Sequence, residues 1–537
     1  MPEPSQRADL LDRASFCVLA GLCLLAIFVF RDYGISNDEE VQHRYGELIV
    51  SYYASGFTDL SLFGYKNLYL YGGLFDIAAV LLAKILPFDV YSIRHLLSAF
   101  CGIGGMAATY ATARLVAGPR AGLIALVSLA LCGPYFGGMF NHTKDIPFAA
   151  AMMAALFFLM KAARDLPRPN WRHLAGFGTM LGAATGLRAM GLLLVGYALL
   201  LICLSALASS PRPLRIAETI RKAATGIARF VPALLLGYVI MLAAWPWASL
   251  APLNPLRAIF SFAHFHYEIR TIVAGAIYKM ADVPWWYVPF YLAIKTPIFV
   301  LAGACIAVAA TMLAYVRNGS AIPARRHIEI GFLIFVAAFP LLCEAIAEGP
   351  AFTGMRHFLF VVPVLAVLAG VGFDAALDAL QQRRLLRILG IAGLSAAMLY
   401  NAVILATLHP YEYLYYNQFV GGLEGAQRRF VMDYWVNMMP EAVRGLRDYL
   451  NLDQDPSRRV YSVGVCGEKF SFDNYAGPHL EATRGWLESD FFIAPTHMNC
   501  DKVIEGRNVF TIRRRGVLIG VVKDRRGISQ KALAPAF

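Results

Sequence analysis

Charged residues are scarce in this 537-residue chain, in which Asp, Glu, Lys and Arg together make up 16% of the sequence. Soluble domains average about a quarter charged residues. Disordered chains are poor in apolar residues, whereas 58% of this chain belongs to the AVILMFWYC set. An ordinary soluble enzyme and a disordered chain are therefore both excluded. The composition indicates a large membrane domain with a soluble part attached.

Several motifs of soluble enzymes are also missing. The nine cysteines are thinly spread and show no paired metal-ligand spacing. The sequence contains no internal repeat, no Walker phosphate loop and no dinucleotide-binding glycine fingerprint. Zinc modules, P-loop enzymes and Rossmann-type enzymes therefore have no support in the sequence.

Eleven apolar segments are long enough to cross a hydrocarbon core, which takes about 20 residues. The first follows Arg7 and Arg13 and ends without a small-residue cleavage site, so it is predicted to be an uncleaved span rather than a signal peptide. Segment 174–188 is the shortest. The predicted spans are 14–30, 94–116, 121–140, 146–163, 174–188, 190–209, 230–250, 296–316, 329–348, 357–375 and 388–408.

The distribution of Lys and Arg predicts the orientation, because these residues favour the cytoplasmic side. Five connections are basic, and neighbouring ones are separated by two spans, so all can lie inside together. This places the N-terminus inside and everything after residue 408 outside. The basic tail 513–526 then faces away from the cytoplasm, so no nucleic-acid partner is predicted. The five connections are 114–120, 164–172, 212–229, 317–326 and 383–387.

Segment 68–87 resembles a span in length but is interrupted by Asp76 and Lys84 and ends at Pro87. A charge at the centre of a span costs about 2.5–3.5 kcal/mol on insertion scales. We therefore predict a juxtamembrane or re-entrant helix on the outer surface instead of a further span.

The tail 409–537 has a different composition and is predicted to be a small α/β domain outside the membrane, following a membrane domain at 1–408. Residues 439–450 have helical spacing, and several short β-rich runs include a candidate hairpin through 514–516. Cys466 and Cys500 are the only cysteines of this tail. Whether they form a disulfide is left open.

Acidic and polar residues gather on the predicted outer face. Asp38, Glu39 and Glu40 directly follow the first span, and the NHTKDIPF element places His142, Lys144 and Asp145 before a later span. A solvated acidic loop and a simple helix start, with Asp145 at its N-terminus, remain alternatives.

Basic residues are expected at the same face. Lys66, Lys295, Arg356 and His357 lie near the ends of apolar segments, where anchoring by snorkelling is the alternative. The HFHYE element, with His264, His266 and Glu268, is a weak metal candidate that an interfacial aromatic loop explains equally well. No metal and no other cofactor is predicted, although a divalent ion stays possible.

This mixture of charges suits transfer of a group from a lipid-borne phosphate. A general base needs a carboxylate near an acceptor hydroxyl, and a phosphate leaving group needs Arg or Lys to stabilise its developing charge. A phosphate leaving group needs no second carboxylic acid to protonate it, unlike the leaving group in glycoside hydrolysis.

The sequence resembles the GT-C membrane glycosyltransferases, specifically bacterial relatives of the dolichyl-phosphate-mannose–protein mannosyltransferases and of the aminoarabinose transferase that acts on lipid A. The resemblance covers about residues 14–440. It is carried by the DEE run at 38–40, KNLYLYGGLF at 66–75, NHTKDIPFAA at 141–150, LAIKTPIFVL at 292–301, RHFLFVVPVLA at 356–366, HPYEYLYYNQFVGG at 409–422 and DYW at 433–435.

The resemblance implies a GT-C membrane fold. With the predicted spans it gives an all-α polytopic membrane protein with about 11 transmembrane helices and outer juxtamembrane helices, followed by the small C-terminal α/β periplasmic domain that the composition predicts. It implies a sugar donor on polyprenyl phosphate, a hydroxyl acceptor on protein, lipid A core or envelope glycan, and inverting transfer at the periplasmic face of the inner membrane. Sugar and acceptor stay open.

The resemblance also implies roles for single residues. Asp38 would be the base, with Glu39 shaping the same pocket, although the choice between the two stays open. Asp145 would be the second acid, and Lys66 and Arg356 would hold the donor phosphate. His142, Lys144, Lys295 and His357 are further candidate binding residues. The rival hypothesis is a transporter or flippase of a lipid-linked sugar.

Overall fold

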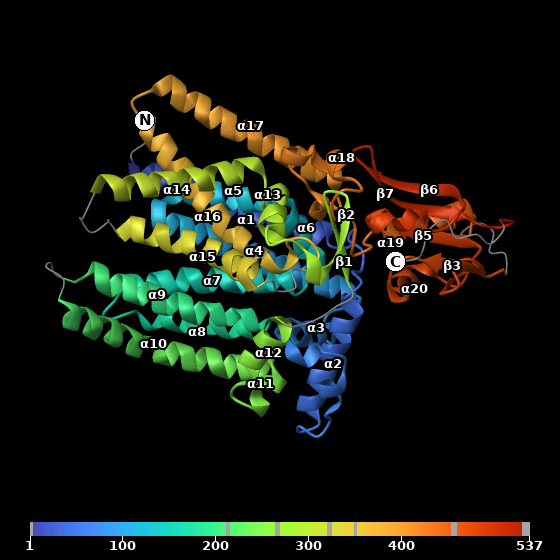
Figure 1. The fold of residues 1–537 in the computed structure, drawn as a ribbon, viewed down its shortest axis with the longest axis horizontal. Coiled ribbons are helices and arrows are strands. Elements are labelled where there is room, and N and C mark those ends of the chain that lie inside the picture. The colour runs from blue at the N-terminus through green and yellow to red at the C-terminus, as the bar shows by residue number, and fades with distance from the viewer. Residues whose placement is uncertain are drawn as a thin grey trace.

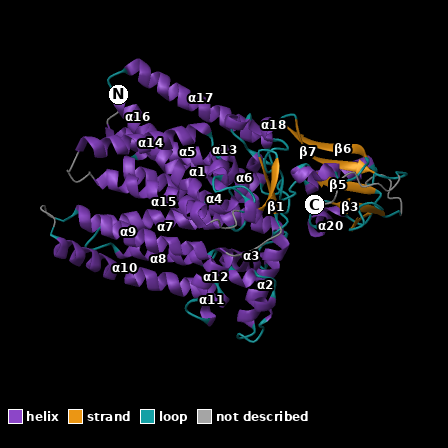
Figure 2. Cartoon of the chain, viewed as in Figure 1, coloured by secondary structure: helices purple, strands orange, loops and turns teal. Residues whose placement is uncertain are grey.

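The computed structural model describes residues 4–210, 215–263, 269–318, 325–347, 352–452 and 459–528. Long helices run side by side in a bundle, and a strand-containing domain lies at one end of it (Figures 1 and 2). The bundle helices are α1 (Pro4–Val29), α4 (Val90–Ala117), α5 (Pro119–Ala130), α6 (Gly133–Asn141), α7 (Asp145–Arg164), α8 (Trp171–Thr185), α9 (Leu193–Ala208), α10 (Ile216–Ala244), α14 (Ile298–Asn318), α15 (Arg325–Ala347), α16 (Val361–Ala379) and α17 (Arg384–Leu408).

Nine helices among the described residues are long and apolar enough to cross a membrane, and the pair α5 and α6 would make a tenth. The predicted multi-pass helical fold is confirmed, but the predicted number of eleven spans is not. Helix α8 has only 15 residues and falls short of a full crossing, although it packs between α7 and α10.

Two predicted spans differ in detail. The predicted continuous span 121–140 is bent by 62° between α5 and α6, because Gly133 and Pro134 start a new helix where Pro cannot continue the old one. Helix α10 begins at Ile216 rather than at 230, so most of the predicted basic connection 212–229 is helical. It ends at Ala244, before Pro246 starts the short helix α11 (Pro246–Leu250).

One end of the bundle, called here the basic end, collects arginines from the helix termini. Arg114 pairs with Asp12 at 2.6 Å, and Arg164 pairs with Glu329 at 2.6 Å. These contacts bring together the start of α1, the ends of α4 and α7 and the start of α15. The prediction that the basic connections share one side is therefore confirmed for these elements.

The opposite end, called here the site end, carries the elements between the long helices. Helix α3 (Leu74–Ala83) has ten residues, too few to span, so the prediction of a non-spanning segment at 68–87 is confirmed. Helix α2 (Glu39–Ala54) crosses α3 closely at Gly46. A Cβ at this position would collide with the backbone of Asp76, so the crossing requires a glycine. The shorter elements of this end are η1 (Ser61–Gly64), η2 (Leu68–Leu70), η3 (Ala189–Leu192), α12 (Asn254–Ala263), β1 (Arg270–Val273), β2 (Ala276–Lys279), η4 (Met280–Asp282), α13 (Tyr287–Lys295), η5 (Arg356–Phe358), η6 (Glu412–Leu414), η7 (Gln418–Val420) and α18 (Gly422–Ala426).

The C-terminal domain is a small sheet with helices against it, as predicted. Strands β3 (Tyr461–Val465), β4 (Leu480–Thr483), β5 (Phe491–Pro495), β6 (Arg507–Arg514) and β7 (Val517–Asp524) follow the order β4-β3-β5-β7-β6. The first three pair in parallel, whereas β7 is antiparallel to β5 and β6, so the predicted hairpin is present. The remaining elements are α19 (Met439–Tyr449), α20 (Lys469–Ala476) and η8 (His497–Lys502).

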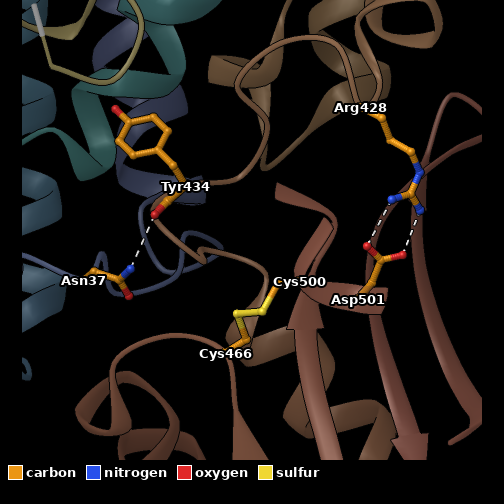
Figure 3. Close-up of a disulfide and its surroundings, with 6 residues drawn as sticks. All are labelled: Asn37, Arg428, Tyr434, Cys466, Cys500 and Asp501. Carbon is orange, nitrogen blue, oxygen red and sulfur yellow. Dashed lines mark hydrogen bonds and ion pairs between the residues drawn. A yellow bond between two sulfur atoms is a disulfide. The ribbon is translucent and has the colours of Figure 1, made fainter. Parts of the chain in front are cut away.

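Cys466 and Cys500 form a disulfide, which answers the question that the sequence left open (Figure 3). The bond joins the loop after β3 to η8. Near it, the Asn37 side chain donates to the Tyr434 carbonyl at 3.4 Å, so the chain just before α2 lies against the segment that leads into the C-terminal domain. The sheet domain is thereby held next to the first polar loop.

Candidate active site

Arg356 stands at the centre of a buried charge cluster at the site end. Its Nη2 lies 2.9 Å from Asp38 Oδ2, and its Nε lies 2.9 Å from Asp145 Oδ2. The other oxygen of Asp145 accepts a bond from Arg188. We call these four residues the charge quartet. Two acids that are far apart in the sequence thus share one guanidinium, as the predicted single crevice requires.

Helix starts position both acids of the quartet. Asp38 directly precedes α2 and Asp145 is the first residue of α7, where the helix dipole favours a negative charge. The alternative explanation that Asp145 marks a helix start is therefore correct for its position in the chain. It does not account for the two arginines, which a helix start does not need.

The two acids differ sharply in exposure. The side chain of Asp145 is 3% exposed, whereas that of Asp38 is 49% exposed. Asp145 is enclosed between Arg188 and Arg356 and is suited to hold them in place. Asp38 keeps an open face from which a substrate hydroxyl can be reached.

An aromatic wall covers the quartet. The guanidinium of Arg356 lies 4.1 Å from the ring centroid of Trp435, a cation–π contact. The indole N–H of Trp435 donates to His142 Nε2 at 2.7 Å. Burial lowers the pKa of His142 to about 4, which keeps the ring neutral and able to accept this bond. His142 therefore places the tryptophan over the arginine.

Two buried lysines flank this cluster. Lys144 lies 4.3 Å from the ring centroid of Tyr71, and Lys295 lies 3.7 Å from that of Tyr416 and donates to the Tyr413 carbonyl at 3.0 Å. No described carboxylate lies within ion-pair distance of either lysine. Burial lowers the pKa of Lys144 to about 8 and that of Lys295 to about 7. Such cations are costly until an anion approaches them.

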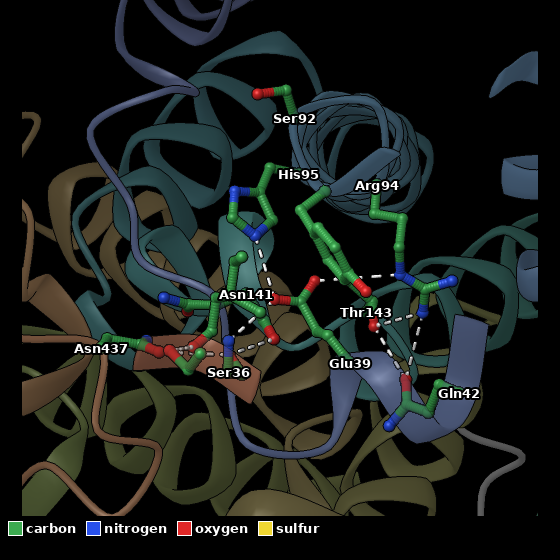
Figure 4. A network of polar contacts seen from close by, with 12 residues as sticks. Ser36, Glu39, Gln42, Ser92, Arg94, His95, Asn141, Thr143 and Asn437 are labelled. Atoms are coloured by element: carbon green, nitrogen blue, oxygen red, sulfur yellow. Dashed lines mark hydrogen bonds and ion pairs between the residues drawn. The ribbon is translucent and has the colours of Figure 1, made fainter. Parts of the chain in front are cut away.

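Glu39 bonds to partners outside the charge quartet (Figure 4). Its carboxylate accepts from the backbone N–H of Ser36 at 2.9 Å and lies 3.0 Å from His95 Nε2. The side chain is 1% exposed, with Arg94 3.9 Å away. Glu39 therefore fixes the loop that carries Asp38. It also lines the small pocket that Asp38, Asp145 and Arg356 share, and its Oε1 is buried there without a hydrogen-bond partner.

Arg94 connects the first polar loop with the NHTKDIPF element. Its Nη2 donates to Asp76 at 2.8 Å and to the Thr143 hydroxyl at 3.2 Å, and Thr143 donates to Gln42 at 2.9 Å. These bonds cross from α4 to α2, α3 and the residue before Lys144 (Figure 4 shows the contacts of Arg94 with Gln42 and Thr143). They connect the helix that follows Asp38 with the residues just before Asp145.

Lys66 does not join the quartet in this structure. Its side chain is exposed, and its ammonium lies over the Tyr65 ring at 5.9 Å. The metal candidates His264, His266 and Glu268 lie outside the described residues. Within the described part of the chain, no group of three His, Cys, Asp or Glu side chains could hold a metal ion.

Sequence reasoning missed three residues of the site. Arg94 and Arg188 lie at the ends of predicted spans, where a basic residue is ordinarily an anchor. Trp435 belongs to the DYW element at 433–435, which contributed to the family resemblance but was given no functional role.

An apolar cavity of about 730 Å³ opens beside the quartet. Its polar lining consists of Tyr71, Arg188, His357 and the acid Glu344. Burial lowers the pKa of His357 well below the ordinary value, which keeps it neutral. The rest of the wall is mainly apolar and aromatic, with contributions from Leu193, Tyr197, Leu200, Phe335, Phe339 and Phe358. The cavity suits a long apolar chain with an anionic head.

Residues 75–236 match the family model described as dolichyl-phosphate-mannose-protein mannosyltransferase, so the resemblance expected from the motifs is confirmed over that part of the chain. No curated protein matches the sequence. Among solved structures, the chain is similar to ArnT from Cupriavidus metallidurans bound to undecaprenyl phosphate, with 14% identity, coverage of 94% of this chain and 97% of that one, and a TM-score of 0.48.

A second similar structure is the apo form of the Archaeoglobus fulgidus oligosaccharyltransferase. The identity is 11%, the match covers 90% of this chain and 69% of that chain, and the TM-score is 0.46.

Proposed function

We propose that this protein is a GT-C type glycosyltransferase of the inner membrane that moves a sugar from polyprenyl phosphate to a hydroxyl acceptor at the periplasmic face. The observation that carries the proposal is the sharing of Arg356 between Asp38 and Asp145, next to an apolar cavity that the fourth quartet residue, Arg188, lines. The family match over residues 75–236 supports the same class of reaction.

The donor's polyprenyl chain would lie in the 730 Å³ cavity, with its phosphate beside Arg188. Arg188 lines the cavity and also pairs with Asp145, so the phosphate would arrive next to the quartet. Arg188 and Arg356 offer planar guanidinium groups, which bind phosphate oxygens in pairs. Lys66 lies outside this arrangement, so we assign the phosphate contacts to the two arginines.

The transfer would be a single displacement at the anomeric carbon. Asp38 takes the proton of the acceptor hydroxyl, and the acceptor oxygen forms its bond to the anomeric carbon from the face opposite the phosphate. The bond between that carbon and the phosphate oxygen breaks, and its electron pair stays on the phosphate. The result is inversion, and the base supplies about 10²–10⁴-fold of the rate enhancement.

The buried lysines fit the change in charge during this step. The donor is a phosphodiester with one negative charge, whereas the departing polyprenyl phosphate is a monoester that carries about 1.5–2 charges at neutral pH. Lys144 and Lys295 lack a described carboxylate partner, so their positive charge is available to the leaving group. A cation placed where negative charge develops stabilises the transition state more than the ground state, and it therefore raises the rate of transfer.

A transporter of a lipid-linked sugar, the rival hypothesis, would place ionisable groups and broken helices near the middle of the membrane. The quartet instead lies at the end of the bundle beside the C-terminal domain. A detergent assay separates the two activities, because only a transferase forms product without compartments.

The proposal is tested by comparing envelope lipids and glycans by mass spectrometry in cells with and without the protein. We expect one species to lose a single sugar residue in its absence, and to regain it with the wild-type chain or with Glu40→Gln. Glu40 is the matched control, since it is exposed and lies two residues from Asp38. Asp38→Asn should fail to restore the sugar. Equal restoration by both variants would contradict the assignment of the base.

A further inference from the structure

A second large cavity, of about 570 Å³, lies at the basic end of the bundle between α7, α9, α10 and α15. It is separate from the candidate active site, because Arg164 and Asp145 lie at opposite ends of the 20-residue helix α7. At 1.5 Å per residue this corresponds to about 30 Å. The charge quartet and this cavity therefore lie at opposite ends of the bundle.

The walls of this cavity divide into a basic part and an apolar part. Arg164, Arg221, Lys222 and Arg325 contribute the basic part, and Glu329 is the acid among its described lining residues. The apolar part comes from the facing helices, with Met160, Leu166, Leu201, Ile202 and Ile328. Serine and threonine hydroxyls lie between the two parts.

The ion pairs inside this cavity do not neutralise all of its basic side chains. Arg164 binds Glu329 through both of its oxygens, at 2.7 and 2.6 Å, and Arg325 reaches the same carboxylate at 3.5 Å. Lys222 lies 3.1 Å from Glu218, which is outside the cavity lining. Arg221 has no described acidic partner and is exposed. Four cations thus line the cavity with one carboxylate, and Glu218 outside the lining pairs with one of them.

We propose that this cavity binds an anionic phospholipid of the leaflet at the basic end, with the lipid phosphate among Arg221, Lys222 and Arg325 and one acyl chain along the apolar wall. A pocket that is basic at a helix end and apolar along the helices matches a charged headgroup that continues into a hydrocarbon chain. Basic pockets between transmembrane helices are suited to such headgroups. Arg164 and Glu329 line the same cavity as an ion pair.

Topology alone also places Lys and Arg at this end, so general attraction to an anionic surface must be separated from a built site. The chain offers a matched control. Arg383 and Arg384 lie at the start of α17, are exposed and are absent from the cavity lining. Removing them changes the net charge of the basic end by the same amount as removing Arg221 and Lys222.

The experiment measures binding of phosphatidylglycerol to the purified full-length protein by native mass spectrometry, with phosphatidylcholine as the neutral lipid. We expect wild type to retain phosphatidylglycerol preferentially. Arg221→Gln with Lys222→Gln should weaken that binding about 30-fold, since each cation near an anionic headgroup contributes about fivefold. Arg383→Gln with Arg384→Gln should change it less than threefold.

A second arm identifies the source of the phosphate group. Inorganic phosphate in excess over the lipid should leave lipid binding unchanged if the apolar wall contributes. Displacement of the lipid by this phosphate would overturn the lipid assignment. Equal losses in the two double variants, or no preference of wild type for the anionic lipid, would overturn the site itself.

Discussion

The two ends of the bundle use the same kinds of side chains in different ways. At the basic end, Arg114 and Arg164 pair with acids of neighbouring helices and remain partly exposed. At the site end, Lys144 and Lys295 are buried without a described carboxylate partner, and Arg356 is shared between two acids. Paired charges connect helices, whereas buried cations without acids are suited to a ligand that brings its own negative charge.

The largest expected effect comes from Asp38, the exposed acid of the quartet. Asp38→Asn should lower the rate of sugar transfer by about 10²–10⁴-fold, because the amide cannot accept the acceptor's proton. The rate is measured with purified protein in detergent, using the donor and acceptor identified from the envelope comparison. Glu40→Gln should stay within about twofold of wild type, and a similar loss in both variants would mean that the effect is general electrostatics.

The next largest effect is on stability, and it should be larger for a buried ion pair than for an exposed one. Arg356→Gln should destabilise the protein by about 3–5 kcal/mol, because it leaves the buried Asp145 with one arginine fewer. Arg114→Gln removes the half-exposed partner of Asp12 and should cost about 0–1 kcal/mol. Thermal unfolding in one detergent gives the comparison. Equal shifts of the melting temperature would contradict the distinction between the two ends.

The disulfide should have a smaller, local effect. Cys466→Ser with Cys500→Ser should cost the C-terminal domain about 2–4 kcal/mol, since the bond closes a loop between residues 34 apart. Faster hydrogen exchange in residues 459–528 measures this loss. Cys17→Ser with Cys203→Ser, at exposed free cysteines, is the control and should leave the exchange of that region unchanged.

The smallest effect is a pH dependence with opposite signs for binding and stability. The pKa of Lys295 is lowered to about 7 by burial, so its positive charge is lost as pH rises through 7 and anion binding weakens, by up to about tenfold per pH unit. Stability changes the other way. Between pH 7 and about 10.5, Lys295 is protonated in the unfolded chain and neutral in the folded one, so the stability of the folded state rises with pH. Lys295→Met should flatten both profiles.

Much of the fold could be predicted from hydropathy and charge, since membrane insertion depends on local composition. The non-spanning segment around Asp76 and the C-terminal sheet both follow from short stretches of sequence. The bend between α5 and α6 was missed, because Gly133 and Pro134 lie within a run that is apolar enough to span.

The site was predicted only in part, for a different reason. The acids and Arg356 stand in motifs, but the pairing of Arg356 with Asp38 joins residues 318 positions apart and depends on tertiary structure. Arg94 and Arg188 resemble anchors in the sequence, and only their buried acid partners distinguish them. Lys66 stands in a motif and yet makes no described contact with the quartet.

The most direct test of the central claim asks whether the apolar cavity beside the quartet holds a polyprenyl phosphate. Gly196 lines that cavity and Gly104 lies on the exposed side of α4, and neither has an atom within 4 Å of an added Cβ. Binding of undecaprenyl phosphate to purified wild type, Gly196→Trp and Gly104→Trp is measured by native mass spectrometry. The account predicts binding by wild type and Gly104→Trp and its loss in Gly196→Trp, and equal binding by all three would contradict it.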